Sequence, residues 1–231
     1  MTMTFSRFDL GLDLPGDANV HAAMALPKKP GIYRNAFKRV LDVTAIVMAA
    51  PVVVPVVLGL AVLIARDGGK PFYSQMRVGK GGKRFRMWKL RSMVCDADDR
   101  MEDYLASHPE ARLEWDTTQK LRDDPRITKM GKILRQTSLD ELPQLWNVLI
   151  GEMSLVGPRP IMVSQQMIYP GVSYYLLRPG CTGYWQTAGR NRTTFEARAE
   201  YDGAYEENLS IKTDIKILFD TIGVMVKGTG C

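Results

Sequence analysis

The chain has 231 residues, 45% of them hydrophobic, and a formal net charge of +6. This length allows one domain with an appendage and a core that needs no covalent staples. Three cysteines without a Cys-x-x-Cys pair argue against a disulfide framework or a zinc site and fit a reducing compartment, and two histidines leave little material for histidine-based catalysis. The positive charge favours anionic partners such as phosphates, nucleic acid or acidic lipid.

The first 36 residues are predicted to form a poorly ordered arm. Residues 1–29 mix glycine, proline, aspartate and small residues without a clear period. A secretory signal is not expected here, because the first long apolar run begins only at Val43.

Residues 43–65 form an uncharged apolar run that exceeds the roughly 20 residues a helix needs to cross a bilayer. Pro51 and Pro55 lie near its middle, where each removes a backbone donor, so a straight helix is not expected. Basic residues flank both ends: Lys38, Arg39, Arg66 and Lys70. The positive-inside tendency favours the cytoplasm for both flanks, which a helix broken at Pro51 satisfies by entering and leaving through one leaflet. We therefore predict a re-entrant membrane helix over residues 37–68, in preference to a kinked span or a buried core helix.

A β-hairpin is predicted next. A glycine turn at residues 79–82 precedes a segment, residues 83–93, in which apolar and basic side chains alternate. The glycines are not a Walker loop, since no Gly-Lys-Ser/Thr follows them. The basic side chains are Lys80, Lys83, Arg84, Arg86, Lys89 and Arg91. They are candidates for contact with lipid headgroups or with a nucleotide diphosphate, the alternative being a solvated face.

The charged segment that follows is predicted to form two short surface helices. Residues 97–121 carry sparse hydrophobic side chains and a break at His108-Pro109. Asp123 and Asp124 precede a proline, and such paired acids usually solvate a turn rather than bind metal. No substrate contact is assigned to this segment.

The main candidates for chemistry are two adjacent carboxylates, Asp140 and Glu141, in the stretch RQTSLDELPQLWNV. Two neighbouring acids can share the chemistry of phosphoryl transfer, in which one attacks phosphorus or holds a divalent cation and the other tunes its charge or handles a proton. Ser138-x-x-Glu141 is also a capping box, in which Glu141 only satisfies a backbone N–H. Because Pro143 disrupts a helix that begins at Ser138, the helix either begins near Leu142, just after the acids, or is kinked.

Arginines in rigid surroundings flank and follow the acids. Arg159 lies between two prolines, which limits the backbone and suits bidentate phosphate binding. Arg178 precedes Pro-Gly, and Arg190 follows a glycine. With Arg135, one turn before the acids, these residues predict an anion site. The alternative is that the arginines are solvated at the surface and the glycines serve backbone geometry.

The C-terminal segment is predicted to be an amphipathic helix. Residues 211–226 place hydrophobic side chains at helical spacing beside several lysines. Such a helix either lies on a membrane surface or packs as an ordinary C-terminal helix.

Five motifs occur in a fixed order: KRVLD at 38–42, WKLRSM at 88–93, TSLDELPQLWNV at 137–148, MSLVGPRP at 153–160, and RPGCTG at 178–183 followed by GRN at 189–191. Together they resemble the bacterial sugar transferases, which are monotopic phosphoglycosyl transferases, in the branch that initiates exopolysaccharide or O-antigen synthesis. The resemblance covers residues 37–226. The insert at residues 97–124 is similar to that of the hexose-1-phosphate branch.

This resemblance implies an α+β fold class, in a mostly helical, membrane-associated monotopic protein with a small β-hairpin or sheet and interfacial amphipathic helices. It divides the chain into the arm (1–36), a re-entrant membrane helix (37–68) and a cytosolic catalytic domain with interfacial helices (69–231). The implied location is the cytosolic face of the bacterial inner membrane. Family members often have Ser-Pro at the helix break, whereas Ala50 precedes Pro51 here, so a serine bond to a freed carbonyl is absent.

The implied activity is that of an undecaprenyl-phosphate hexose-1-phosphate transferase. Asp140 would attack the β-phosphorus of a UDP-sugar, expected to be UDP-galactose or UDP-glucose, and release UMP. Undecaprenyl phosphate would then accept the sugar phosphate. Mg²⁺ is the implied cofactor, with Asp140 and Glu141 as ligands or Glu141 as a base. Inner-membrane lipid is a further implied partner, and binding of nucleic acid is not expected. Whether the chain forms a homo-oligomer is left open.

The same resemblance implies roles for the basic residues. Arg135, Arg159 and Arg190 carry over as phosphate contacts, and Arg178 joins them as a substrate-binding candidate. Lys89 or Arg91 is expected near the metal or the headgroup. Phosphoryl transfer depends mostly on positioning and charge neutralisation, which arginines and a cation site supply.

Two other classes of function stay open from the residues. A basic, membrane-bound adaptor that binds acidic lipid or nucleic acid would show salt-dependent binding and no turnover of nucleotide sugars. A lipid phosphatase or another phosphotransferase would use the same acid pair but release phosphate without moving sugar to lipid.

Overall fold

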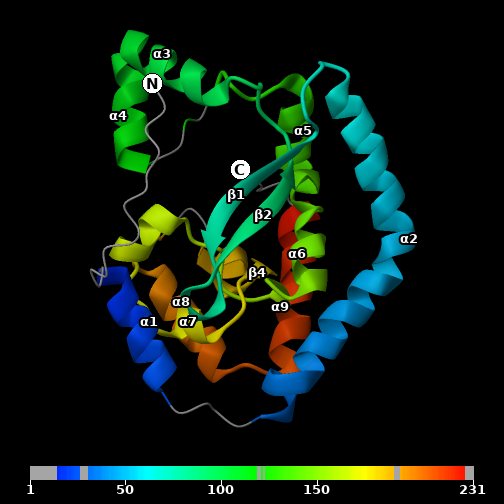
Figure 1. The fold of residues 1–231 in the computed structure, drawn as a ribbon, viewed down its shortest axis with the longest axis vertical. Helices are drawn as coiled ribbons and strands as arrows, with labels where there is room; N and C mark the ends of the chain where they lie inside the picture. Colours follow the sequence, from blue (N-terminus) through cyan, green and yellow to red (C-terminus); the bar gives the residue numbers. More distant parts are fainter. Residues whose placement is uncertain (1–14, 27–30, 119–120, 122, 190–192, 227–231) are drawn as a thin grey trace.

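The structure, a computed structural model, describes residues 15–26, 31–118, 121, 123–189 and 193–226. Within them the fold is mostly helical with small sheets, which confirms the α+β class (Figure 1). The α-helices are α1 (Pro15–Ala25), α2 (Lys38–Ala65), α3 (Ala97–Ser107), α4 (Pro109–Thr118), α5 (Lys129–Thr137), α6 (Gln144–Ile150), α7 (Ser173–Leu176), α8 (Arg198–Glu207) and α9 (Ile211–Val226). The strands are β1 (Phe72–Val78), β2 (Arg84–Leu90), β3 (Ser154–Val156) and β4 (Gly180–Thr182). Short 3-10 or π-helical turns are η1 (Tyr33–Phe37), η2 (Lys80–Gly82), η3 (Leu139–Glu141), η4 (Val163–Ile168) and η5 (Trp185–Gly189).

The long apolar helix α2 touches the rest of the molecule at its two ends. Near its start Ile46 packs with Phe85 of the hairpin, and near its end Ile64 packs with Leu90. Between these contacts most of its large side chains are exposed, with Met48 at 76%. The stretch from Tyr33 to Ala65 is the one helical span among the described residues whose length and mean hydropathy of 2.7 would suffice to cross a membrane.

Neither proline interrupts this helix. Both Pro51 and Pro55 lie inside α2, which is helical from Lys38 to Ala65 and bowed along one edge of the molecule (Figure 1). A proline removes one donor and crowds the preceding turn, and a helix can absorb this by bending. The predicted break at Pro51 is therefore wrong, because the chain stays helical through both prolines.

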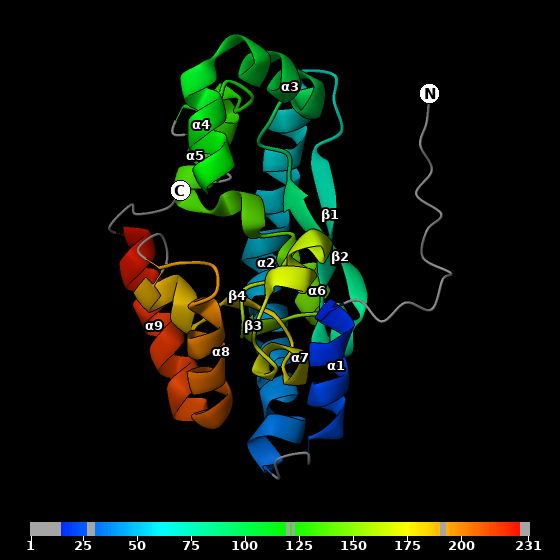
Figure 2. The same cartoon turned by 90° about the vertical axis from the view of Figure 1, so that its left-hand side faces the viewer.

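The predicted β-hairpin is confirmed. β1 and β2 pair antiparallel from Phe72–Leu90 to Val78–Arg84, and positive φ angles at Gly81 (66°) and Gly82 (74°) make the turn. Alternation along β2 buries Phe85 and Met87 against α2 and α6. The two charged helices α3 and α4 also form as predicted, and lie at the end of the molecule away from α8 and α9 (Figure 2).

Part of the segment predicted as a disordered arm is helical. Residues 15–25 form α1, in which Ala23 is buried against a core cluster that includes Tyr174. Asn19 donates a hydrogen bond to the Tyr169 carbonyl at 2.9 Å. The prediction missed it because the helix has almost no hydrophobic period of its own, although proline in its first turn and several alanines favour helix. Residues 1–14 lie outside the described part of the chain.

Two proline-glycine motifs meet in the short parallel sheet of β3 and β4, where Ser154 pairs with Gly180 and Val156 with Thr182. A Cβ at Gly180 would lie 2.1 Å from the Gly157 nitrogen, so a side chain cannot be accommodated at this position. The glycines of both motifs therefore bring two backbones into contact.

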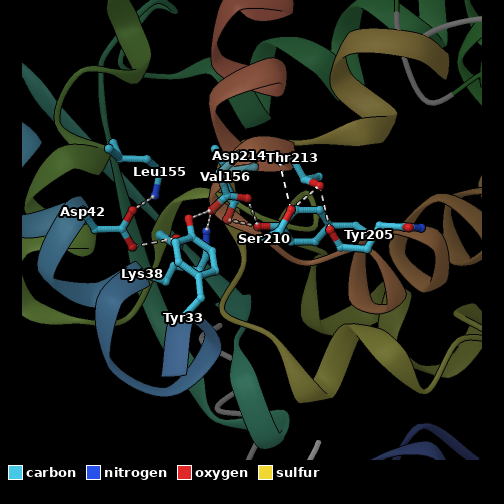
Figure 3. A network of polar contacts seen from close by, with 11 residues as sticks. Tyr33, Lys38, Asp42, Leu155, Val156, Tyr205, Ser210, Thr213 and Asp214 are labelled. Atoms are coloured by element: carbon cyan, nitrogen blue, oxygen red, sulfur yellow. Dashed lines mark hydrogen bonds and ion pairs between the residues drawn. The ribbon is translucent and has the colours of Figure 1, made fainter. Parts of the chain in front are cut away.

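A buried polar network anchors the start of α2 to the domain (Figure 3). Asp214 of α9 accepts hydrogen bonds from Tyr33 (2.6 Å), Lys38 (2.5 Å) and Tyr205 (2.6 Å). One turn further along α2, Asp42 is linked to β3 through the Ser154 hydroxyl (2.7 Å) and the Leu155 N–H (3.1 Å). These bonds satisfy two carboxylates that would be costly to bury alone.

Candidate active site

The turn between α5 and α6 holds the two candidate acids. Thr128 caps the start of α5 by accepting a hydrogen bond from the Gly131 N–H at 2.9 Å. Ser138 ends α5 in the left-handed conformation, with φ of 56°. The turn η3 follows directly and carries Asp140 and Glu141.

The capping-box interpretation is wrong for this turn. The Ser138 side chain makes no capping hydrogen bond, because this residue serves as the left-handed C-cap of α5. α6 begins at Gln144 with Pro143 as its N-cap residue, which confirms that the helix starts just after the acids. Proline is tolerated there because it needs no intrahelical N–H bond at a helix start.

A lysine from the hairpin joins the acids. Lys89 Nζ lies 2.7 Å from Glu141 Oε1 and 3.8 Å from Asp140 Oδ2. Asp140 is buried, with 7% of its surface exposed. Burial raises the pKa of the Asp140 carboxyl above its usual range, the positive charge of Lys89 opposes the shift, and the charge of Glu141 adds to it. A partly desolvated carboxylate beside one cation is a suitable nucleophile for phosphorus.

Asn147, a residue to which no role was assigned from the sequence, fixes α6 against the strand that carries Lys89. Its side chain accepts the Trp88 N–H at 3.1 Å and donates to the Arg86 carbonyl at 2.7 Å and to Glu152 at 2.6 Å. Asn147 is fully buried. The only sequence signal was a polar residue among the hydrophobic positions of a predicted helix.

Arg135 and Arg91 occupy different places relative to the acids. Arg135, in the last turn of α5, donates to the Ser92 hydroxyl at 3.0 Å, and its charge lowers the pKa of Asp140. Arg91 instead donates to the Ile64 carbonyl at the end of α2 (3.2 Å) and to Asp67, which lies just after the helix (2.5 Å). It therefore lines a separate cavity of about 490 Å³ beside the end of α2.

The remaining predicted arginines that the structure describes have contacts elsewhere than at the acids. The Arg159 guanidinium lies 5.8 Å from the centroid of the Trp185 ring. Arg178 donates to the Gly151 carbonyl at 2.9 Å, which ties two loops together. Arg190 lies outside the described residues. Two arginines that were not singled out, Arg77 and Arg198, share the surroundings of Arg159, and no motif in the sequence marked them.

The acid pair could hold a divalent cation together with substrate phosphates and water. Among the described residues no group of three or more His, Cys, Asp or Glu side chains is arranged around a common point. Mg²⁺ is often bound by one or two carboxylates plus substrate phosphates, and the adjacent Asp140 and Glu141 fit that pattern.

Comparison with known proteins agrees with the motif pattern. Residues 33–228 match the family model for bacterial sugar transferases. The chain is 47% identical over 195 residues to a UDP-galactose-lipid carrier transferase of Erwinia amylovora and 44% identical over 195 residues to an undecaprenyl-phosphate galactose phosphotransferase of Salmonella typhimurium. Each match covers 84% of this chain and 41% of the relative, so the chain spans less than half the length of these proteins.

A shorter relative matches over most of its length. The exopolysaccharide production protein ExoY of Sinorhizobium fredii is 39% identical over 202 residues, which are 87% of this chain and 88% of that protein. The acid pair, the hairpin lysine and the proline-flanked Arg159 all lie within the residues matched by the family model. The chain belongs to the bacterial sugar transferase family.

Proposed function

We propose that the chain transfers a hexose 1-phosphate, of galactose or glucose, from a UDP-sugar to undecaprenyl phosphate and so initiates exopolysaccharide or O-antigen synthesis. The observation that carries the proposal is the buried Asp140 carboxylate beside Glu141, with Lys89 Nζ within 3.8 Å of one acid and 2.7 Å of the other. Relatives named for galactose or glucose transfer to a lipid carrier or to undecaprenyl phosphate support the substrate class.

The first step forms a covalent intermediate. An Asp140 carboxylate oxygen attacks the β-phosphorus, the bond from that phosphorus to the bridging oxygen breaks, and UMP leaves with the electron pair. In the second step a phosphate oxygen of undecaprenyl phosphate attacks the same phosphorus. The acyl-phosphate bond then breaks, which restores the carboxylate and yields the lipid diphosphosugar. Asp140 must be ionised to attack, and Lys89 favours this form by opposing the effect of burial.

The other charged side chains position and neutralise the phosphates. Lys89 holds Glu141 close to Asp140, and Arg135 adds positive charge from the end of α5. Mg²⁺, bound by Asp140 or Glu141, would supply charge neutralisation at the phosphate oxygens. Phosphoryl transfer gains most of its rate from such positioning and charge.

The membrane arrangement is part of the proposal. Both ends of α2 pack against the same domain, whereas its middle exposes large apolar side chains. This supports a re-entrant helix that enters and leaves through the cytosolic leaflet of the inner membrane, because a spanning helix would carry its ends to opposite sides. On α9, Ile217 is buried while Phe219 is 69% exposed, which supports a helix at the lipid boundary.

The test is UMP release from UDP-galactose and UDP-glucose by the full chain in detergent or nanodiscs, with undecaprenyl phosphate and Mg²⁺. Asp140→Asn is expected to abolish UMP release and transfer of radiolabelled sugar to lipid, because the amide cannot attack phosphorus. Asp116→Asn, an exposed acid paired with Arg112 on α4, is the matched control and should keep full activity. Undiminished release by Asp140→Asn would refute the proposal. Absence of turnover by the unmodified protein with any nucleotide sugar would favour an adaptor, and phosphate release without sugar transfer a phosphatase.

A further inference from the structure

Two arginines from distant parts of the chain lie over one tryptophan, and a third lies within electrostatic range of both. The guanidinium carbons of Arg159 and Arg198 lie 5.8 Å and 4.1 Å from the centroid of the Trp185 ring. Arg77 reaches the same place through β1, because it pairs with Met162, three residues after Arg159. The cluster therefore joins the end of the hairpin, the proline-flanked loop and the start of α8.

This arginine cluster of Arg77, Arg159 and Arg198 lacks a matching negative charge. The Nε atoms of Arg77 and Arg198 are buried and have no hydrogen-bond partner. Arg77 donates to a neutral amide, Gln75 Oε1, at 2.7 Å. Within the described part of the chain no carboxylate forms an ion pair with any of the three.

The electrostatics of the cluster agree with this geometry. Burial and, after it, the positive charge of Arg159 lower the pKa of both Arg77 and Arg198 to about 10. The negative charge of Asp202 raises the pKa of Arg198, and the negative charge of Glu141 in the acid pair raises the pKa of Arg77. Burying like charges together is costly unless a counter-ion compensates for them, so the cluster is complete only with an anion bound. The influence of Glu141 on Arg77 means that the cluster lies within electrostatic range of the acid pair.

We infer that Arg77 and Arg198, together with Arg159, bind the phosphate of the nucleotide that leaves when Asp140 attacks. This inference rests on the proposed function and adds Arg77 and Arg198 to the site. A nucleoside monophosphate leaves as a phosphate anion, and guanidinium groups bind phosphate oxygens bidentately. Lipid phosphate is the less suitable ligand, because α8, which carries Arg198, packs on α7 and η5, whereas the apolar helix α2 packs on α6 and β3.

The experiment measures UMP binding to the full chain in nanodiscs by calorimetry, which needs no turnover. Arg77→Gln and Arg198→Gln are each expected to weaken UMP binding about ten- to hundredfold, the range for losing a charged hydrogen bond. Arg112→Gln removes an equal charge from an exposed ion pair on α4 and should leave UMP affinity unchanged. Without ligand, both cluster variants should melt at or above the temperature of the unmodified protein, because they relieve repulsion. A purely structural role predicts lower melting temperatures and normal UMP affinity.

Two further arms separate the alternatives. Asp140→Asn removes a negative charge and none of the three guanidinium groups, so it should bind UMP at least as tightly as the unmodified protein while losing transfer. A failure of the proposed transfer and a failure of this inference therefore give different results. Short-chain polyprenyl phosphate serves as the second probe: if its affinity falls in the variants while UMP affinity does not, the assignment to the nucleotide is overturned. Should the glutamine variants not fold, hydrogen exchange of the unmodified protein decides. UMP must slow exchange in the peptides that contain Arg77 and Arg198, and no protection there overturns the inference.

Discussion

Replacing Lys89 with methionine is expected to shift the acidic limb of the pH–rate profile upward by about one to three pH units. Lys89 Nζ lies 3.8 Å from Asp140 Oδ2, and the lysine side chain is 22% exposed. Two unit charges about 4 Å apart interact by about 4 kcal/mol at an effective dielectric constant near 20, and partial exposure reduces this. A range of about 1.4 to 4 kcal/mol corresponds to about one to three pKa units.

The sign follows from the state that reacts. Asp140 attacks as a carboxylate, and burial already raises its pKa. Loss of Lys89 removes the largest influence that lowers that pKa, so the protonated, unreactive form persists to higher pH. As the pH is lowered, the Lys89→Met variant should therefore lose activity at a higher pH than the unmodified protein does. Its activity should recover toward alkaline pH.

The assay is the pH dependence of kcat/KM for UMP release, with Lys89→Arg and Lys132→Met as comparisons. Lys89→Arg retains the charge and should keep the acidic limb near its original position. Lys132 is exposed on α5, so its replacement should leave the profile unchanged. An unshifted acidic limb in Lys89→Met would show that this lysine does not govern the ionisation of Asp140.

Three further changes test how the fold supports the site. Asp214→Asn should lower the free energy of unfolding by about 3 to 5 kcal/mol in denaturant titration, because it breaks a buried charge pair, whereas Asp220→Asn in an exposed pair should change it by less than about 1 kcal/mol. Gly180→Ala should lower the melting temperature sharply, because its Cβ would lie 2.1 Å from a backbone nitrogen; Gly203→Ala, with 3.9 Å of clearance inside α8, should hold or raise it. Burial raises the pKa of Asp202 to about 7, so between about pH 4 and 7 the folded chain keeps a proton that the unfolded chain loses, and stability should fall with rising pH by up to about 1.4 kcal/mol per unit. Asp202→Asn should flatten that slope in thermal melts, and an unchanged slope would assign it to another group.

The local sequence pattern was sufficient to predict the elements whose structure is determined by their own residues. The hairpin followed from alternation around a glycine turn, and the helix after Pro143 followed from the chemistry of proline. Helix α1 was missed because its stability comes from contacts with residues such as Tyr169, far away in the chain. Continuity of α2 through Pro51 was also not foreseen, since proline weakens a helix without always ending it.

The site was only partly accessible to the same reasoning. Lys89 and Arg91 look alike in the sequence, yet one meets the acids and the other meets Asp67. The arginine cluster depends on long-range packing around Trp185, for which no local signal exists. Spacing can therefore identify the acids themselves, but which cation reaches them is decided by tertiary structure.

The short distance along the chain between Lys89 and Arg91 has a consequence for variation in this protein. Leu90, fully buried, lies between a side chain directed to the acid pair and one bound at the end of the apolar helix. One residue inserted here would turn the following side chains to the opposite face. Changes of length at this point cannot preserve both contacts, so evolution and engineering alike must vary the loops and leave this spacing intact.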